Sequence, residues 1–150
     1  MRSFIVFFSP FMMFLLMAPG LVLPSPVKAL PTSEQELVTS VRSALDKKNV
    51  EMMLDLVCWD GVDSSMKDSL KATFQYLVSQ KVKDVNIGPL RPGAITEYVL
   101  EGKKFKTNLT PIKQLNIVID DGDPNGKLTT SLMVGQKGND FLIATAAQVK

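Results

Sequence analysis

Apolar residues recur at helical spacing in three successive segments between residues 33 and 80, which predicts three amphipathic helices. Ser33 and Glu36 stand at capping-box spacing and open the first helix. Asn49 is placed to cap a second helix of about two turns, and Asp63 or Ser64 to cap a third that ends near residue 80. The apolar positions of the three helices are, in chain order, Leu37, Val41, Ala44 and Leu45; Val50, Met53, Leu54 and Val57; and Met66, Leu70, Phe74 and Leu77.

Beyond residue 82 the spacing changes to the alternation of strands, and Gly and Pro mark the turns between apolar segments. A tight hairpin is expected through residues 101–103. Thr110 and Pro111 should bend the chain within the third strand, which then continues over residues 112–119. The expected strand segments are 82–87, 95–100, 104–109 with 112–119, 128–134 and 141–146.

Helices that all precede the strands indicate an α+β fold rather than alternating βαβ units. We expect three N-terminal helices packed on a bent antiparallel sheet of about five strands. A single domain should span residues 30–150, because no repeat, low-complexity stretch or glycine-rich phosphate loop interrupts this part of the chain.

Residues 1–29 have the layout of a secretory signal peptide. Arg2 precedes an apolar run over residues 4–23, and Pro24 and Pro26 lead to Ala29, after which we expect cleavage. The protein would then be secreted or periplasmic. The alternative is a retained N-terminal membrane anchor, since the apolar run is just long enough to cross a bilayer, although Pro and Gly interrupt it.

The charge balance and the lack of histidine exclude several classes of protein. Arg2 and Lys28 in the expected signal are two of the 17 basic residues, so the 15 that remain would balance 15 acidic residues. A neutral chain has no field to attract nucleic acid, and we expect no such partner. Catalysis by imidazole is excluded because the chain has no histidine. Cys58 is the single cysteine, so it cannot form an internal disulfide, and we expect it to be buried without a metal or other cofactor.

The order of the predicted elements, with two short segments, resembles the nuclear transport factor two-like fold of the cystatin-like group. The two segments are Leu45-Asp46-Lys47-Lys48-Asn49-Val50-Glu51 and Cys58-Trp59-Asp60-Gly61-Val62. The resemblance covers nearly all of residues 30–150. It implies a cone-shaped pocket between helices and sheet, and a homodimer formed through the open face of the sheet. That fold serves isomerases, dehydratases, epoxide hydrolases and non-catalytic partners, so it does not define an activity.

Two carboxylates are candidates for acid–base chemistry. Asp60 follows the second helix and would act as a base if it projected into the mouth of the cone; the alternative is a turn residue beside Gly61 at positive φ. Glu97 would have a raised pKa if its strand face were inward, and would be a solvated edge-strand acid if that face were outward. The alternation does not decide which face is inward, because a slip of one residue exchanges the two faces.

Three aromatic residues are candidates for contact with an apolar ligand: Trp59, Tyr76 and Tyr98. The indole of Trp59 offers a large apolar face. The alternative is a core residue whose N–H donates to a carbonyl oxygen.

Two other motifs are incomplete. Asp121, Asp123 and Asn125 match the first half of a calcium-binding loop, but Leu132 stands where the bidentate glutamate should be, and a polar hairpin turn is the alternative. Asn108-Leu109-Thr110 is a glycosylation sequon followed by Pro111, which makes it a poor acceptor, and we interpret it as a chance match.

Together these observations predict an exported, non-catalytic domain that binds a small apolar ligand or a protein partner. Membrane contact is expected only if the N-terminal segment is retained. The alternative function is a metal-independent isomerase or dehydratase in which a pocket carboxylate, Asp60 or Glu97, works with a tyrosine.

Overall fold

The computed structural model describes residues 29–120, 122 and 128–149. Three helices precede seven strands in this part of the chain. In chain order the elements are α1 (Glu34–Asp46), α2 (Val50–Leu54), α3 (Ser64–Ser79), β1 (Val82–Pro89), β2 (Glu97–Leu100), β3 (Lys103–Thr107), β4 (Pro111–Ile119), β5 (Leu128–Lys137), β6 (Asp140–Ile143) and β7 (Ala146–Gln148).

The helices begin where their capping residues predict. The Ser33 hydroxyl accepts a hydrogen bond from the N–H of Glu36, and the side chains of Asn49 and Asp63 cap α2 and α3 in the same way. α2 has five residues and is shorter than the two turns expected, because the chain already turns after Leu54. These caps use local backbone donors, so they can be predicted from short segments of sequence.

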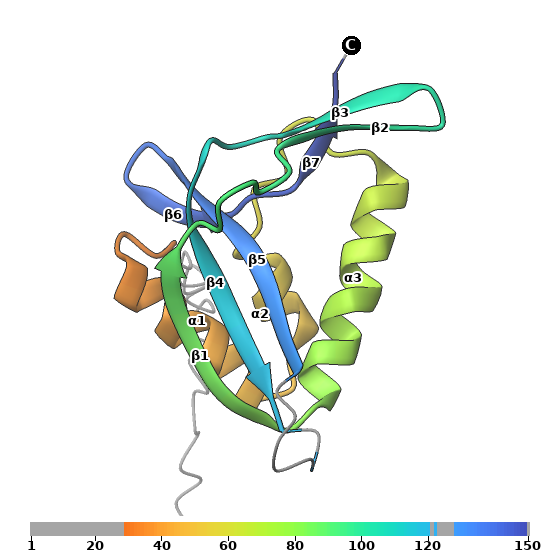
Figure 1. Ribbon diagram of the computed structural model, residues 1–150. Helices are drawn as coiled ribbons and strands as arrows, with labels where there is room; N and C mark the ends of the chain where they lie inside the picture. The colour runs from red at the N-terminus through yellow and green to blue at the C-terminus, as the bar shows by residue number, and fades with distance from the viewer. Residues whose placement is uncertain (1–28, 121, 123–127, 150) are drawn as a thin grey trace, which may run out of the picture.

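The strands form two antiparallel sheets. The large sheet has the order β1-β4-β5-β6, and the small sheet has the order β2-β3-β7. In Figure 1, α1 and α2 lie behind the large sheet, α3 stands beside β5, and the small sheet lies across one end of the molecule. The α+β class, with helices before antiparallel strands, is therefore confirmed.

The expected arrangement of a single sheet of about five strands is wrong. β3 and β4 had been expected to form one bent strand, but β3 pairs with β2 and β7 in the small sheet, whereas β4 pairs with β1 and β5 in the large sheet. The chain changes sheets over residues 108–110. The last expected strand, residues 141–146, is also divided: β6 ends at Ile143, and β7 begins at Ala146 and pairs with β3.

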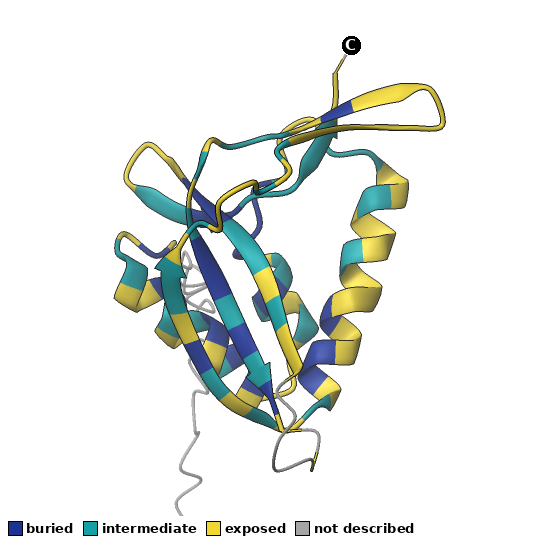
Figure 2. Cartoon of the chain, in the orientation of Figure 1, coloured by how far each residue is buried: buried dark blue, intermediate teal, exposed yellow. Residues whose placement is uncertain are grey.

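The core lies between the helices and one face of the large sheet. α3 contributes to it mainly through its C-terminal half, and the other half of the helix is more exposed (Figure 2). Burying each of these large apolar side chains contributes roughly 1.5–3 kcal/mol. The largest fully buried side chains are Phe74, Leu37, Met53, Leu77, Leu115, Ile117, Ile143, Val41 and Val134.

The β2–β3 hairpin closes as the sequence predicts. Leu100 and Lys103 are cross-strand partners, so the loop consists of Glu101 and Gly102. Both loop residues have positive φ, 50° and 73°, which is the backbone of a type I′ turn. The right-handed twist of the hairpin follows from this turn.

Asn108 holds the place where the chain changes sheets. Its Nδ2 donates to the Cys58 carbonyl oxygen at 2.6 Å and to the Asp60 carbonyl oxygen at 3.3 Å. Its Oδ1 accepts from the Thr145 N–H at 3.0 Å, and its own N–H donates to the Thr145 carbonyl oxygen at 2.8 Å. One side chain thus ties the segment after α2 to the link between β6 and β7. The same bonds occupy the amide to which a glycan would be attached.

β5 closely approaches residues 108–110, where the chain changes sheets, at Gly135. A Cβ at this position would lie 2.7 Å from the Leu109 Cβ and 2.8 Å from the Thr110 carbonyl oxygen. Only glycine fits there without a shift of backbone.

No helix among the described residues is long and apolar enough to cross a membrane. The apolar run over residues 4–23, which carries the signal-peptide and anchor hypotheses, lies outside the described residues.

We expect Asn108→Ala to lower the free energy of unfolding by about 2–3 kcal/mol, because it leaves backbone groups of two segments, the Cys58 and Asp60 carbonyls and the Thr145 N–H, without this partner. Chemical denaturation followed by circular dichroism measures this change. Asn139→Ala, in an exposed turn, is the control and should alter stability by less than about 0.5 kcal/mol. Equal effects of the two substitutions would contradict the role assigned to Asn108.

We expect Gly135→Ala to cost about 1–3 kcal/mol, since the added methyl group meets the Leu109 Cβ and the Thr110 carbonyl oxygen, neither of which is the far end of a flexible side chain. Gly88→Ala is the matched strand control, because its Cβ would meet only the Asn116 side chain, at 3.6 Å. Thermal melting of the two variants side by side tests the contact, and a Gly135→Ala protein as stable as Gly88→Ala would rule it out.

Candidate functional site

Asp60 lies on the surface and is held as an anion. Its carboxylate accepts from the Lys137 Nζ at 2.7 Å, and its side chain is 59% exposed. The hydrogen bond and the charge of Lys137 lower the pKa of Asp60 below its ordinary value. Gly61 follows with φ 68°, as the turn interpretation requires. The residue therefore has the environment of a solvated turn carboxylate.

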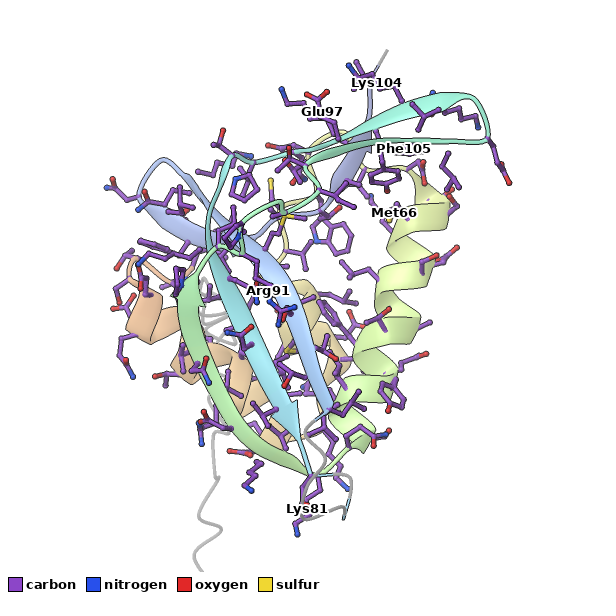
Figure 3. The ribbon with its side chains drawn as sticks, in the orientation of Figure 1. Met66, Lys81, Arg91, Glu97, Lys104 and Phe105 are labelled. Carbon is purple, nitrogen blue, oxygen red and sulfur yellow. The ribbon has the colours of Figure 1, made fainter. Side chains whose placement is uncertain are left out.

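Glu97 is also exposed, on the face of the small sheet that carries Lys104 and Lys106 of β3. Its carboxylate oxygens lie 3.2 Å from the Lys104 Nζ and 3.3 Å from the Lys106 Nζ. Figure 3 shows Glu97 and Lys104 together at the end of the molecule that holds the small sheet. Hydrogen bonds from the two lysines lower the pKa of Glu97, and the bond from Lys104 has the larger effect. A lowered pKa is the reverse of what a buried general base or acid requires.

The three candidate aromatic residues have three different environments. Trp59 is half-buried, and its indole N–H donates to the Leu54 carbonyl oxygen at 3.0 Å, as the core interpretation predicts. Tyr76 is 49% exposed on α3. Tyr98 stacks on Phe105 across the hairpin, with 5.3 Å between ring centroids. In Figure 3, Phe105 projects from the small sheet toward α3, where Met66 lies.

Trp59 also borders a shallow hollow of about 330 Å³ between α2 and α3. The Lys67 Nζ already lies 5.7 Å from the centroid of the indole ring, at cation–π distance. The remaining lining residues are mostly charged: Glu51, Asp55, Asp68 and Lys71, with Leu54. This lining does not resemble the apolar pocket that was expected for Trp59.

The candidate calcium ligands Asp121, Asp123 and Asn125 lie outside the described residues. Among the residues that are described, no group of three or more acidic or cysteine side chains is placed to hold a metal ion. Cys58 is buried, as predicted.

A groove with a volume of about 760 Å³ lies between α1 and β1. β1 is an edge strand of the large sheet, so one side of its backbone pairs with β4 and the other side faces the groove. The helix wall presents one face of α1 and includes Val38, Arg42 and Ser43; the strand wall includes Val85 and Ile87. The groove thus combines an open strand edge with a mixed apolar and charged helix face.

Arg42 crosses this groove from α1 to β1. Its Nη2 donates to the Asp84 carboxylate at 3.0 Å and to the Val85 carbonyl oxygen at 3.4 Å. The Val85 carbonyl therefore points away from β4, and the backbone groups of Ile87, two residues on, point to the same side. Hydrogen bonds lower the pKa of Asp84. The largest effect comes from Asn86, followed by the Val85 backbone and then Arg42, so the ion pair is maintained at neutral pH.

The face of the large sheet opposite the helices carries a connected row of polar side chains. The Asn116 Nδ2 donates to the Asn86 Oδ1 at 3.2 Å, and the Ser131 hydroxyl donates to the Asn116 Oδ1 at 2.9 Å. Gln114, which is 6% exposed, donates to both Asn116 and Ser131. These groups bond one another across three strands, so this face is polar and internally satisfied.

Sequence reasoning missed both the groove and the polar row. Arg42 and Asp84 are 42 residues apart, and only the docking of α1 on β1 brings them together. The alternation of Val85 and Ile87 with Asp84 and Asn86 indicates a strand with one buried face, but not that the strand lies at an edge.

No family model matches the chain, and no curated protein and no solved structure matches it. The resemblance to the nuclear transport factor two-like fold therefore stays a prediction.

We expect the carboxyl groups of Asp60 and Glu97 to titrate below their ordinary range, since lysine partners stabilise the charged forms. Their ion pairs should add stability above the unfolded-state pKa, and that stability should be lost as the pH falls through the lower folded-state pKa. Carbon-13 NMR titration of the two carboxyl groups measures this directly. A pKa above the ordinary value for either group would contradict the ion pairs and support acid–base catalysis.

Proposed function

We propose that this protein is an exported, non-catalytic binding domain that takes an extended segment of a partner protein in the groove between α1 and β1. The segment would pair with the open edge of β1 and so add a strand to the large sheet. Export follows from the predicted signal peptide. The observation that carries the proposal is the Val85 carbonyl, which faces the groove and accepts a hydrogen bond only from the side chain of Arg42 among the described contacts.

Strand addition needs main-chain donors and acceptors on a free edge. Val85 supplies an outward carbonyl, and Ile87 supplies both an outward N–H and an outward carbonyl, since alternate residues of an antiparallel strand point the same way. Regular backbone bonds of this kind give affinity for any extended chain. The side chains of α1 would then distinguish one segment from another.

The helix wall favours a segment in which apolar and polar side chains alternate. Side chains of an added strand would point alternately toward α1 and toward the polar face of the sheet. Val38 offers an apolar contact to the first set, and the second set lies beside Asn86, whose Nδ2 has one N–H left beyond its bond to Asp84. We therefore expect apolar residues facing α1 and hydrogen-bonding residues on the other face.

Arg42 protects the edge when no partner is bound. Free strand edges promote aggregation, and natural proteins cover them with charged side chains. The Arg42 guanidinium bonds the Val85 carbonyl at the long distance of 3.4 Å, and its side chain is half exposed. A backbone N–H of a partner can replace such a contact at low cost.

A small apolar ligand inside the domain is less well supported. The space between helices and sheet, where the cone interpretation puts a pocket, contains the closely packed side chains of the core. The grooves at the surface have substantially charged linings. For the isomerase or dehydratase alternative, Asp60 and Glu97 have neither the burial nor the raised pKa that the chemistry needs.

The test uses the exported protein and a displayed library of random peptides as the probe. Peptides that are selected should shift the backbone amide resonance of Ile87 and protect it from exchange. Ser43→Met fills the groove without adding charge, and we expect it to weaken peptide binding by about tenfold or more.

Ser69→Met, on the exposed face of α3, places the same side chain outside the groove and serves as the control. Peptides that bind without affecting Ile87, or that bind the two variants equally, would disprove the site. A small molecule that copurifies with the exported protein and is seen by native mass spectrometry would favour the ligand-binding interpretation over a protein partner.

A further inference from the structure

The small sheet exposes more apolar side chain than any other strand region described. Ile95 and Val99 are 68% and 69% exposed, and Leu100 is 54% exposed. Tyr98 and, on the neighbouring end of the chain, Val149 are also exposed. Figures 1 and 2 show the β2–β3 hairpin projecting past the start of α3, with all of β2 exposed.

β2 is an edge strand whose outer side can be assigned residue by residue. The Thr107 N–H donates to the Thr96 carbonyl oxygen at 2.9 Å, so Thr96 directs its backbone toward β3. Tyr98 and Leu100 follow at two-residue intervals and also face β3. Glu97 and Val99 therefore direct their N–H and carbonyl groups away from the sheet.

We propose that β2 pairs antiparallel with β2 of a second copy of this chain, so that two small sheets join edge to edge. This interface is separate from the groove at β1 and does not rest on the function proposed above. It differs from the dimer through the open sheet face that the fold resemblance implies. That open face carries the row of Asn86, Asn116 and Ser131, whose polar groups already bond one another.

Charge selects the register of this pairing. In a two-fold symmetric antiparallel pair, residues whose backbone groups face outward must lie opposite one another. Three registers near the middle of β2 meet this condition. Pairing Glu97 with its own counterpart sets two carboxylates together, and pairing Val99 with its own counterpart sets Glu97 against Glu101 of the second copy. Like charges directly opposite are destabilising.

In the third register, Glu97 faces Val99 of the second copy, and no like charges are opposed. Tyr98 then lies opposite its own counterpart, beside the Phe105 ring on which it already stacks. The strand is therefore self-complementary in one register, which favours a second copy over an unrelated partner. A dimer of this kind would carry two free β1 grooves and could engage two copies of a partner segment.

Two substitutions at one position test both the interface and its register. In the third register Val99→Glu places a carboxylate opposite Glu97 of the second copy, twice by symmetry. We expect it to raise the dimer dissociation constant by about tenfold or more. Val99→Lys places an ammonium group opposite the same carboxylates and should leave the dimer as strong as, or stronger than, the unaltered protein. Thr129→Glu puts the same charge on the open face of the large sheet and should have no effect.

Sedimentation equilibrium of the exported protein, from dilute solution to its solubility limit, measures the dimer, and circular dichroism confirms that each variant folds. A protein that stays monomeric throughout would overturn the proposal. Equal weakening by Val99→Glu and Val99→Lys would overturn the register, and dissociation caused by Thr129→Glu would assign the dimer to the open face instead.

Discussion

The arrangement of this protein depends on the hydrogen bonds of Asn108. Its side-chain amide bonds the backbone after α2 and the backbone between β6 and β7, at the point where the chain leaves one sheet for the other. A parallel bridge between Val57 and Ile143 lies in the same region. Three segments that are far apart in sequence therefore meet at one polar junction, and breaking it would leave several backbone groups without partners.

The edge positions of β1 and β2 follow from that junction. Because the chain changes sheets there, the strands divide between two sheets, with β1 and β6 at the edges of the large sheet and β2 and β7 at the edges of the small one. Backbone bonds from the segments near Pro31 and Leu56 cover β6. The edges at β1 and β2 are treated differently. On β1, Arg42 pairs with Asp84 and also donates to an outward backbone carbonyl. On β2, Glu97 pairs with two lysines of β3, but no described side chain bonds the outward backbone groups, and the strand also carries exposed apolar side chains. We interpret the β1 edge as a reversible binding site and the β2 edge as a more permanent contact.

Local chemistry could be predicted from the sequence, and contacts over long separations could not. The caps Ser33, Asn49 and Asp63 act on backbone groups three residues away, so the helices begin where expected. The Trp59 N–H has its carbonyl partner and Cys58 is buried, as their apolar surroundings indicate.

The division into two sheets depends on Asn108, whose bonds reach 37 to 50 residues along the chain. The same limit applies to the groove, since Arg42 meets β1 only after the helix has docked. For Glu97, the alternation of β2 left two faces equally apolar, and its lysine partners on β3 identify the outer one.

Amide hydrogen exchange of the exported protein, followed residue by residue, tests the central claim that β1 and β2 are open edges. In dilute solution we predict fast amide exchange at Ile87, Glu97 and Val99, and slow exchange at Asn86, whose amide faces β4. Raising the protein concentration should then slow amide exchange at Glu97 and Val99, while exchange at Ile87 stays fast. Exchange at Ile87 as slow as at Asn86 in the dilute protein would show that the edge of β1 is already covered, which would contradict an open β1 edge.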